Sequence, residues 1–204
     1  HYCGFNSTTA LECLDCKKHV FLEKPIATNL KDANKLIEIS EKNNLILQIG
    51  HLYRFNNSIL KAKEIIKNKK LGTVHSVYFS WNNFEPIFND RGIILDLGIH
   101  PIDIIDYIFD GKYENIKCRG WGIRQNNPEF AILNYKLSTP DKQTIFINIE
   151  LSWLNPIRKR EMIIIGDENT LKVQCVDQKI SLIDNSSKNE ETISVVLNNT
   201  IRDE

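Results

Sequence analysis

The sequence predicts an α/β segment followed by an α+β domain that is built on a large open, mainly antiparallel sheet. Two observations support this prediction. Helix-like and strand-like patterns alternate over roughly the first 50 residues, which is typical of a parallel sheet. From Val74 onwards, alternating strands follow one another through short, turn-rich connections, which favours antiparallel neighbours. A chain of 204 residues has room for one large domain or two small ones.

The α/β segment begins with a helix and a short strand, which Pro25 ends. A second helix follows; Thr28 or Asn29 can cap it, and Asp32 stands in its first turn. The apolar side chains of this helix recur at helical spacing. A second short, apolar strand then ends at Gly50. The four elements are expected at residues 8–17, 19–22, 28–44 and 45–50.

The α+β domain begins with a helix at 56–72, closed by lysines and Gly72. One further long helix, at 94–109, interrupts the strands. We expect helices on one face of the sheet and an opposite face apolar enough to need a partner. Strands are expected at residues 74–81, 130–137, 144–153, 161–166, 170–176, 179–184 and 192–197.

Composition narrows the class of protein. The formal net charge is zero, which argues against nucleic acid or an anionic membrane as the main partner. No apolar run approaches the ~20 residues that span a bilayer. The five cysteines, Cys3 among them, are an odd and scattered set, which favours reduced thiols and a cytoplasmic location. Cys13 and Cys16 have the spacing of a redox motif, but no strand precedes them, so packing cysteines are the favoured interpretation. The five histidines lack metal-ligand spacing, so we expect no metal ion.

The helix expected at 94–109 is largely apolar but carries a polar seam at positions i, i+4, i+7 and i+11. Pro101 cannot donate a main-chain hydrogen bond, so the regular helix begins near Gly98 or kinks there. On spacing alone, the carboxylate and imidazole at the start of the seam have two explanations: they cap the helix, or they form a functional pair. The members of the seam are Asp96, His100, Asp103 and Tyr107.

Three segments, taken in order and at their separation, closely resemble the Gfo/Idh/MocA oxidoreductases: HVFLEKP at 19–25, GHLYRFN at 50–56 and GIILDLGIHPID at 92–103. Enzymes of this family are NAD(P)-dependent and act mostly on sugars, cyclitols and sugar nucleotides. The resemblance covers nearly the whole chain. It implies that the α/β segment belongs to a Rossmann domain, and it favours the functional interpretation of Asp96 and His100.

The resemblance also implies a role for each motif residue. Lys24 would lie near the nicotinamide of NAD or NADP and near the substrate hydroxyl, while Glu23 and Pro25 would shape that cofactor-binding turn, for which a cis peptide bond is one solution. Asp96 and His100 would face the substrate. A histidine suits proton acceptance from a hydroxyl, and a lysine can stabilise the developing alkoxide. Asp96 would fix the histidine tautomer or hold a neighbouring hydroxyl.

One departure from the family is large. The family opens with a strand, a G-x-G-x-x-G loop that cradles the cofactor pyrophosphate, and a helix. This sequence has no such loop, and its nearest approach, GWG at 120–122, lies among the strands. We therefore expect residues 1–50 to be the last part of a Rossmann domain and residues 51–204 to be the substrate-binding and oligomerisation domain, without the family's C-terminal helix. The chain is expected to be an internal fragment or a degenerate gene product, inactive by itself.

The substrate is less well defined. Arg54 is expected beside the substrate cleft, with a surface salt bridge as a nearly equal alternative. Parts of the β-rich half are similar to the branch of the family that oxidises UDP-linked amino sugars, and Arg158, Lys159 and Arg160 could meet a diphosphate. A solvated strand end is the more ordinary explanation of these three residues. Free sugars and inositol stay open as substrates.

Two expectations concern assembly. The open sheet favours a homodimer or homotetramer, and the small-molecule partner is a sugar, a sugar nucleotide or a cyclitol. The alternative to an enzyme is a non-catalytic module of the same superfamily that senses sugars or serves assembly. The joint presence of Lys24, Asp96 and His100 argues for the enzyme.

Overall fold

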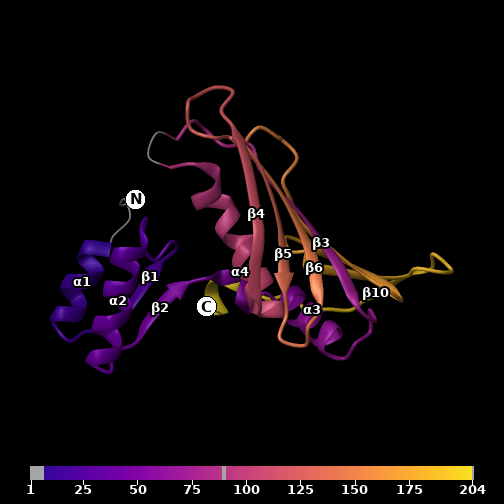
Figure 1. The fold of residues 1–204 in the computed structure, drawn as a ribbon, viewed down its shortest axis with the longest axis horizontal. Helices are drawn as coiled ribbons and strands as arrows, with labels where there is room; N and C mark the ends of the chain where they lie inside the picture. Colours follow the sequence, from indigo (N-terminus) through magenta and orange to yellow (C-terminus); the bar gives the residue numbers. More distant parts are fainter. Residues whose placement is uncertain (1–6, 89–90, 204) are drawn as a thin grey trace. The chain divides into compact units, whose positions relative to one another are not determined.

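The computed structural model describes residues 7–88 and 91–203 (Figure 1). The chain divides into two compact units, one ending at His51 and the other spanning Leu52–Asp203. The sequence predicted the boundary between the two parts after residue 50, one residue before the boundary in the structure. Cys3 lies outside the described residues, and the other four cysteines are free thiols. Among the described residues, no helix is long and apolar enough to cross a membrane.

The first unit is a small α/β layer. Strand β1 (Val20–Glu23) pairs in parallel with β2 (Leu47–Gly50), which confirms the predicted parallel arrangement. Helices α1 (Ser7–Asp15) and α2 (Leu30–Lys42) supply its small core, in which Ala10, Leu14 and Leu36 are buried. Of the two caps considered for α2, the structure selects Asn29, whose side chain accepts a hydrogen bond from the main-chain N–H of Asp32 at 2.9 Å.

The second unit is built on one eight-stranded sheet with the strand order β10-β9-β8-β7-β3-β6-β5-β4. The pair β3–β6 is parallel and the other neighbouring pairs are antiparallel, which confirms the predicted fold class. The strands are β3 (Val74–Asn82), β4 (Lys112–Trp121), β5 (Phe130–Ser138), β6 (Thr144–Ser152), β7 (Lys159–Gly166), β8 (Asn169–Gln174), β9 (Lys179–Asp184) and β10 (Glu190–Ile193).

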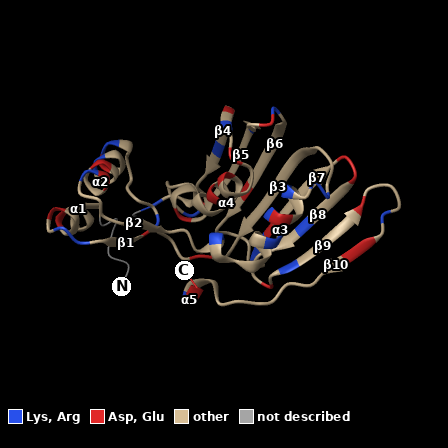
Figure 2. Cartoon of the chain, turned by 90° about the horizontal axis from the view of Figure 1, so that it is seen from below, with Lys and Arg blue, Asp and Glu red and all other residues tan. Residues whose placement is uncertain are grey.

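Two helices cover one face of this sheet (Figure 2). They are α3 (Asn57–Lys67) and α4 (Ile99–Phe109). The core lies between them and the sheet, because alternate strand residues such as Ile147 and Leu151 point inward and are fully buried. The opposite face is mixed in character: Tyr78 and Phe146 are about half exposed, and polar side chains stand between such apolar ones.

The sequence did not predict β4, the edge strand. All ten of its residues are exposed, so it has no alternation of apolar and polar residues to reveal it. It also did not predict the short helices η1 (Leu52–Phe55) and α5 (Thr200–Asp203). Strand β10 was expected at 192–197 but pairs only at Glu190–Ile193. Further along, the carbonyl of Val196 accepts a hydrogen bond from the Asn57 side chain of α3, so the chain there leaves the sheet.

Candidate active site

The helix with the polar seam has two parts. A π-helical turn, η2 (Ile94–Gly98), precedes the regular helix α4, which begins at Ile99. This agrees with the expected start near Gly98, since Pro101 removes a main-chain donor from the first turn of α4. A Cβ atom on Gly98 would come within 2.9 Å of the Leu151 side chain. A glycine is therefore needed where this turn packs against β6, two residues before the histidine.

His100 lies against two aromatic rings from other elements. The ring of Tyr53, from η1, is 5.2 Å from the imidazole in an edge-to-face arrangement at 74°, and the ring of Trp81, from β3, is 6.4 Å away. Tyr53 and Trp81 also contact each other, with centroids 5.0 Å apart. His100 and Asp96 are both half-buried. The imidazole is thus held in a shielded position at the N-terminal end of the helix, where it keeps access to solvent.

Arg160, at the start of β7, lies against the same two rings. Its side chain is buried, its Cζ atom lies 5.3 Å from the Trp81 ring, and its Nη1 donates to the carbonyl of Asn82 at 2.6 Å. The Tyr53 side chain lies beside it against the same Trp81 ring, and burial raises the pKa of Tyr53. Sequence reasoning did not connect Tyr53, Trp81 and Arg160 with His100, because the sheet register that pairs Trp81 with Arg160 is not visible in the sequence.

Arg54 forms an ion pair with the buried Asp103 of the polar seam. Its Nε donates to Oδ1 at 2.9 Å and its Nη2 donates to the same oxygen at 2.6 Å. The hydrogen bond to Asp103 raises the pKa of Arg54. Of the two explanations offered for Arg54, the structure therefore contains the salt bridge, although its partner is buried. The pair ties η1 to α4 and so fixes Tyr53 beside His100.

A buried carboxylate supports the segment that leads into η2. Glu129 is fully buried and accepts hydrogen bonds from the Arg124 Nε at 2.6 Å and from the main-chain N–H of Ile123 at 2.9 Å. Burial opposes its ionisation, but these hydrogen bonds outweigh burial, so the pKa of Glu129 is lowered. The adjacent carbonyl of Pro128 accepts from the N–H of Ile93 at 3.2 Å, which holds the chain one residue before the π-helical turn.

In the first unit, the Glu-Lys-Pro motif lies directly at the carboxyl end of β1. Glu23 is exposed, Lys24 is half-buried and Pro25 is buried after a cis Lys24–Pro25 peptide bond, which confirms the conformation that the sequence allowed. Ligands of parallel α/β sheets bind beyond the carboxyl ends of the strands. This turn therefore lies at the edge of the sheet where ligands of such folds bind, and the 204 residues contain no G-x-G-x-x-G loop for a pyrophosphate.

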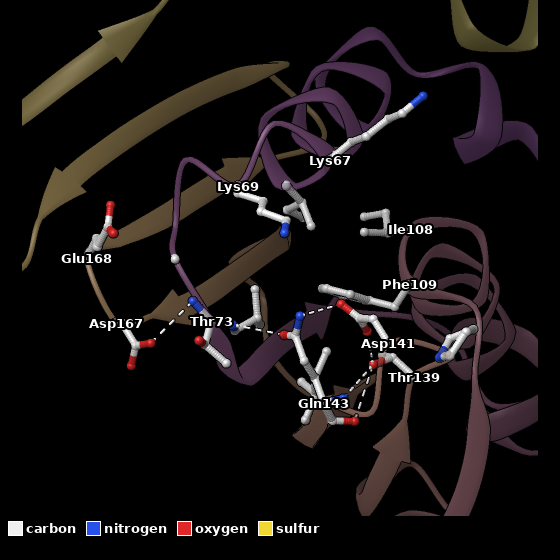
Figure 3. A pocket seen from close by; sticks show the side chains of 15 residues that line it. Lys67, Lys69, Thr73, Ile108, Phe109, Thr139, Asp141, Gln143, Asp167 and Glu168 are labelled. Atoms are coloured by element: carbon white, nitrogen blue, oxygen red, sulfur yellow. Dashed lines mark hydrogen bonds between the residues drawn. The ribbon is translucent and has the colours of Figure 1, made fainter.

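A separate pocket of about 590 Å³ lies at the other end of α4, near Ile108 and Phe109 (Figure 3). None of the predicted site residues lines it. Several of its polar groups are bonded to one another: Gln143 donates to Asp141 at 2.6 Å and accepts from the N–H of Val74 at 3.3 Å. Among the described residues, no group of three or more His, Cys, Asp or Glu side chains could hold a metal ion.

Comparison with known proteins identifies the class and then the family. Residues 4–51 match the model of an oxidoreductase family with an NAD-binding Rossmann fold, and residues 59–172 match the GFO/IDH/MocA C-terminal domain. The second match spans more than half of the chain. The protein belongs to the GFO/IDH/MocA family, as the three sequence motifs indicated.

Relatives with curated names act on cyclitols and sugars. Myo-inositol 2-dehydrogenase of Thermotoga maritima is 33% identical over 120 residues, which are 56% of this chain and 36% of the relative. Glucose-6-phosphate 3-dehydrogenase of Bacillus subtilis is 29% identical over 125 residues, which are 54% of this chain and 36% of the relative. The matched part of the chain thus covers about a third of the length of these relatives.

Solved structures share the fold over nearly the whole chain. UDP-N-acetylglucosamine 3-dehydrogenase from Acidithiobacillus ferrooxidans superposes with a TM-score of 0.83 at 17% identity and covers 98% of this chain and 64% of that one. An inositol dehydrogenase homologue from Azotobacter vinelandii, complexed with NADH and myo-inositol, gives a TM-score of 0.81 at 16% identity and covers 94% of this chain and 53% of that one. At this identity the likeness establishes the fold and leaves the substrate open.

Proposed function

We propose that the protein transfers a hydride between NAD or NADP and a hydroxyl-bearing carbon of a sugar, a sugar nucleotide or a cyclitol. The observation that carries the proposal is His100, half-buried with Asp96 at the start of α4 and held by Tyr53 and Trp81. A half-buried imidazole of fixed orientation suits a general base. Membership of the oxidoreductase family and the Glu-Lys-Pro turn in the first unit support the same function.

In the proposed reaction, the substrate is a carbinol. Its hydroxyl proton passes to His100 while a hydride leaves the carbon, so a carbonyl forms. Glu23, Lys24 and Pro25 would hold a nicotinamide cofactor, which would supply the acceptor for the hydride. Lys24 donates a hydrogen bond to the oxygen as negative charge develops on it. Asp96 fixes the orientation of His100 or holds a neighbouring hydroxyl, and Arg54 supports the site through Asp103.

We assign the cofactor side of the site to residues 1–50, in which Glu23, Lys24 and Pro25 form the turn at the end of β1. Residues 51–204 are proposed to bind the substrate and to form the contact between subunits. The parallel pairing of β1 and β2 and the one-sided cover of the large sheet support this division.

The test is a turnover assay on the longest protein that the reading frame encodes. The purified protein is offered NAD and NADP with myo-inositol, glucose 6-phosphate and UDP-N-acetylglucosamine, and NADH or NADPH formation is followed by absorbance. We expect reduction of at least one cofactor with at least one substrate. A folded protein that binds NAD but reduces it with none of a broad panel of sugars and cyclitols would argue against the proposal.

A second candidate is a non-catalytic module that binds sugars or serves assembly. Sugar binding without any cofactor binding, in the longest encoded protein, would support this candidate. Cofactor reduction in the same protein would eliminate it.

A further inference from the structure

Arg160 is a buried cation without a carboxylate partner. Only 8% of the residue is exposed, and its Nη1 donates to two main-chain carbonyls, those of Asn82 at 2.6 Å and Lys159 at 3.1 Å. Its Cζ atom also lies over the Trp81 ring, which Tyr53 contacts from another element. Within residues 7–88 and 91–203, no carboxylate lies at ion-pair distance from it. A buried guanidinium with these partners keeps most of its positive charge uncompensated.

The charges around Arg160 increase this imbalance. Burial lowers the pKa of Arg160, and the positive charge of the neighbouring Arg158 lowers it further. Tyr53 and Glu85 act in the opposite direction, and the Glu85 carboxylate already accepts a hydrogen bond from the Asn83 side chain. Lys159, which lies between the two arginines in the sequence, forms an ion pair with Glu161 at 2.8 Å. Two arginines therefore give this end of β7 a local positive charge.

Arg160 and His100 share their neighbours. Trp81 lies 6.4 Å from the His100 ring and 5.3 Å from the Arg160 Cζ, and Tyr53 contacts both side chains. A sugar whose hydroxyl reaches His100 would thus have its other substituents within a few bonds of Arg160. The planar fork of a guanidinium matches a phosphoryl or carboxylate group with paired hydrogen bonds.

We propose that Arg160 binds an anionic group of the substrate, a phosphoryl or a carboxylate, and so selects acidic sugars over neutral sugars and cyclitols. This inference rests on the proposed function, because it requires that the substrate lie beside His100. A neutral ligand such as myo-inositol would leave the guanidinium without a counter-charge in a desolvated position, and an anionic ligand would supply it. Arg158, exposed on the same side, would attract the anion from solution.

The experiment is a binding titration of the 204-residue chain with four probes: glucose, glucose 6-phosphate, myo-inositol and UDP-N-acetylglucosamine. Binding is measured by calorimetry and by the NMR signal of the Trp81 indole N–H. We expect at least one phosphorylated probe to bind roughly tenfold or more tightly than glucose and to shift the Trp81 signal. The two phosphorylated probes distinguish a monoester from a nucleotide diphosphate.

Variants assign the preference to its residue. Arg160→Gln should lower the affinity for the phosphorylated probe by roughly 10- to 100-fold more than it lowers the affinity for glucose. Arg160→Lys keeps the positive charge but lacks the planar guanidinium, so its affinity for the phosphorylated probe should lie between those of the unchanged chain and Arg160→Gln. This second variant keeps the test usable if Arg160→Gln does not fold. Arg119→Gln, on the exposed strand β4, is the matched control and should have no effect.

The outcomes separate two kinds of failure. Equal affinity for glucose and glucose 6-phosphate in the unchanged chain, with UDP-N-acetylglucosamine no tighter, overturns the role of Arg160 and leaves the proposed function standing. The role of Arg160 is also overturned if both Arg160 variants lose affinity for glucose and for the phosphorylated probes by the same factor, because Arg160 would then only support the fold. If no probe binds to the folded chain, the role of Arg160 is overturned, and the proposed function is decided separately by turnover of the longest encoded protein.

Discussion

His100 is the residue on which the proposed chemistry depends most. Replacing it by alanine should lower kcat by about 10²- to 10⁴-fold with little change in KM, because proton transfer occurs in the transition state. Lys24→Ala should act in the same direction, since alkoxide charge develops only as the hydride leaves. Steady-state kinetics on the longest encoded protein, with the melting temperature recorded in parallel, measures both effects.

Asp96→Asn separates orientation from substrate binding. If Asp96 only orients the imidazole, Asp96→Asn should lower kcat by a smaller factor than His100→Ala does. If Asp96 holds a substrate hydroxyl, Asp96→Asn should raise KM. A purely structural role of His100 predicts a different result. His100→Ala would then lower the melting temperature through lost contact with Tyr53 and Trp81 and leave kcat per folded molecule unchanged. That result would remove His100 from the mechanism.

Glu129 makes the stability of the second unit depend on pH. Its pKa in the folded state is lowered, so ionised Glu129 adds stability above the pKa of an unfolded glutamate, about 4.3. That contribution is lost as the pH falls through the lower, folded pKa. We therefore expect Glu129→Gln to be less stable at neutral pH and to lose less stability on acidification below about pH 4.

The measurement for Glu129 is denaturant unfolding at a series of pH values. Glu191→Gln, on the exposed strand β10, is the control and should follow the unchanged protein throughout. Parallel acid profiles for the Glu129 variant and the unchanged protein would mean that the buried hydrogen bonds from Arg124 and Ile123 do not lower this pKa.

At the scale of the secondary-structure elements, two asparagine caps offer a matched comparison. The Asn56 side chain caps α3 by accepting from the main-chain N–H of Ser58 at 3.0 Å, and it also donates to the carbonyl of Cys175 at 3.2 Å in a buried setting. Asn29 caps α2 in an exposed setting through a single main-chain donor at 2.9 Å. Asn56→Ala therefore leaves a buried carbonyl unsatisfied as well as removing a cap.

We expect Asn56→Ala to lower the free energy of unfolding of its unit by about 2 kcal/mol, and Asn29→Ala to lower that of its own unit by about 1 kcal/mol or less. Hydrogen exchange reports the two units separately and so measures both changes. Equal costs for the two substitutions would show that the contact between Asn56 and Cys175 adds nothing to stability.

At the scale of the whole chain, cofactor binding tests the departure from the family pattern. The sequence has no G-x-G-x-x-G, and a backbone loop of that kind supplies most of the donors to the pyrophosphate. We expect NADH and NADPH to bind the 204-residue chain weakly or not at all in calorimetry. Micromolar binding would mean that another part of the chain replaces the glycine loop.

Association through the open sheet is the second prediction at this scale. Tyr78 and Phe146 are exposed on the face that no helix of the described residues covers, and burying such side chains favours a dimer or tetramer. Sedimentation at tens of micromolar should show an oligomer, and Phe146→Asp should shift it towards the monomer. Leu30→Asp, at a more exposed apolar position of α2, should leave the mass unchanged. A monodisperse, folded monomer of the unchanged chain would contradict the prediction.

The sequence predicts the order and type of most elements correctly, because apolar periodicity, capping residues and turns act over a few residues. It predicted the parallel pair β1–β2, the start of α4 near Gly98 and, through three motifs in order, the family, and it allowed the cis bond that the structure has before Pro25. It could not reveal β4, since an edge strand exposed along its whole length carries no apolar pattern.

Which side chains meet at the candidate site depends on long-range packing. Tyr53, Trp81 and Arg160 stand 28 and 79 positions apart in sequence, yet the antiparallel register of β3 and β7 pairs Trp81 with Arg160, and η1 brings Tyr53 against both. The same long-range packing gave Arg54 a buried partner in Asp103. Local sequence patterns contain no information on strand register between distant segments, because register is set by burying a whole face of the sheet at once.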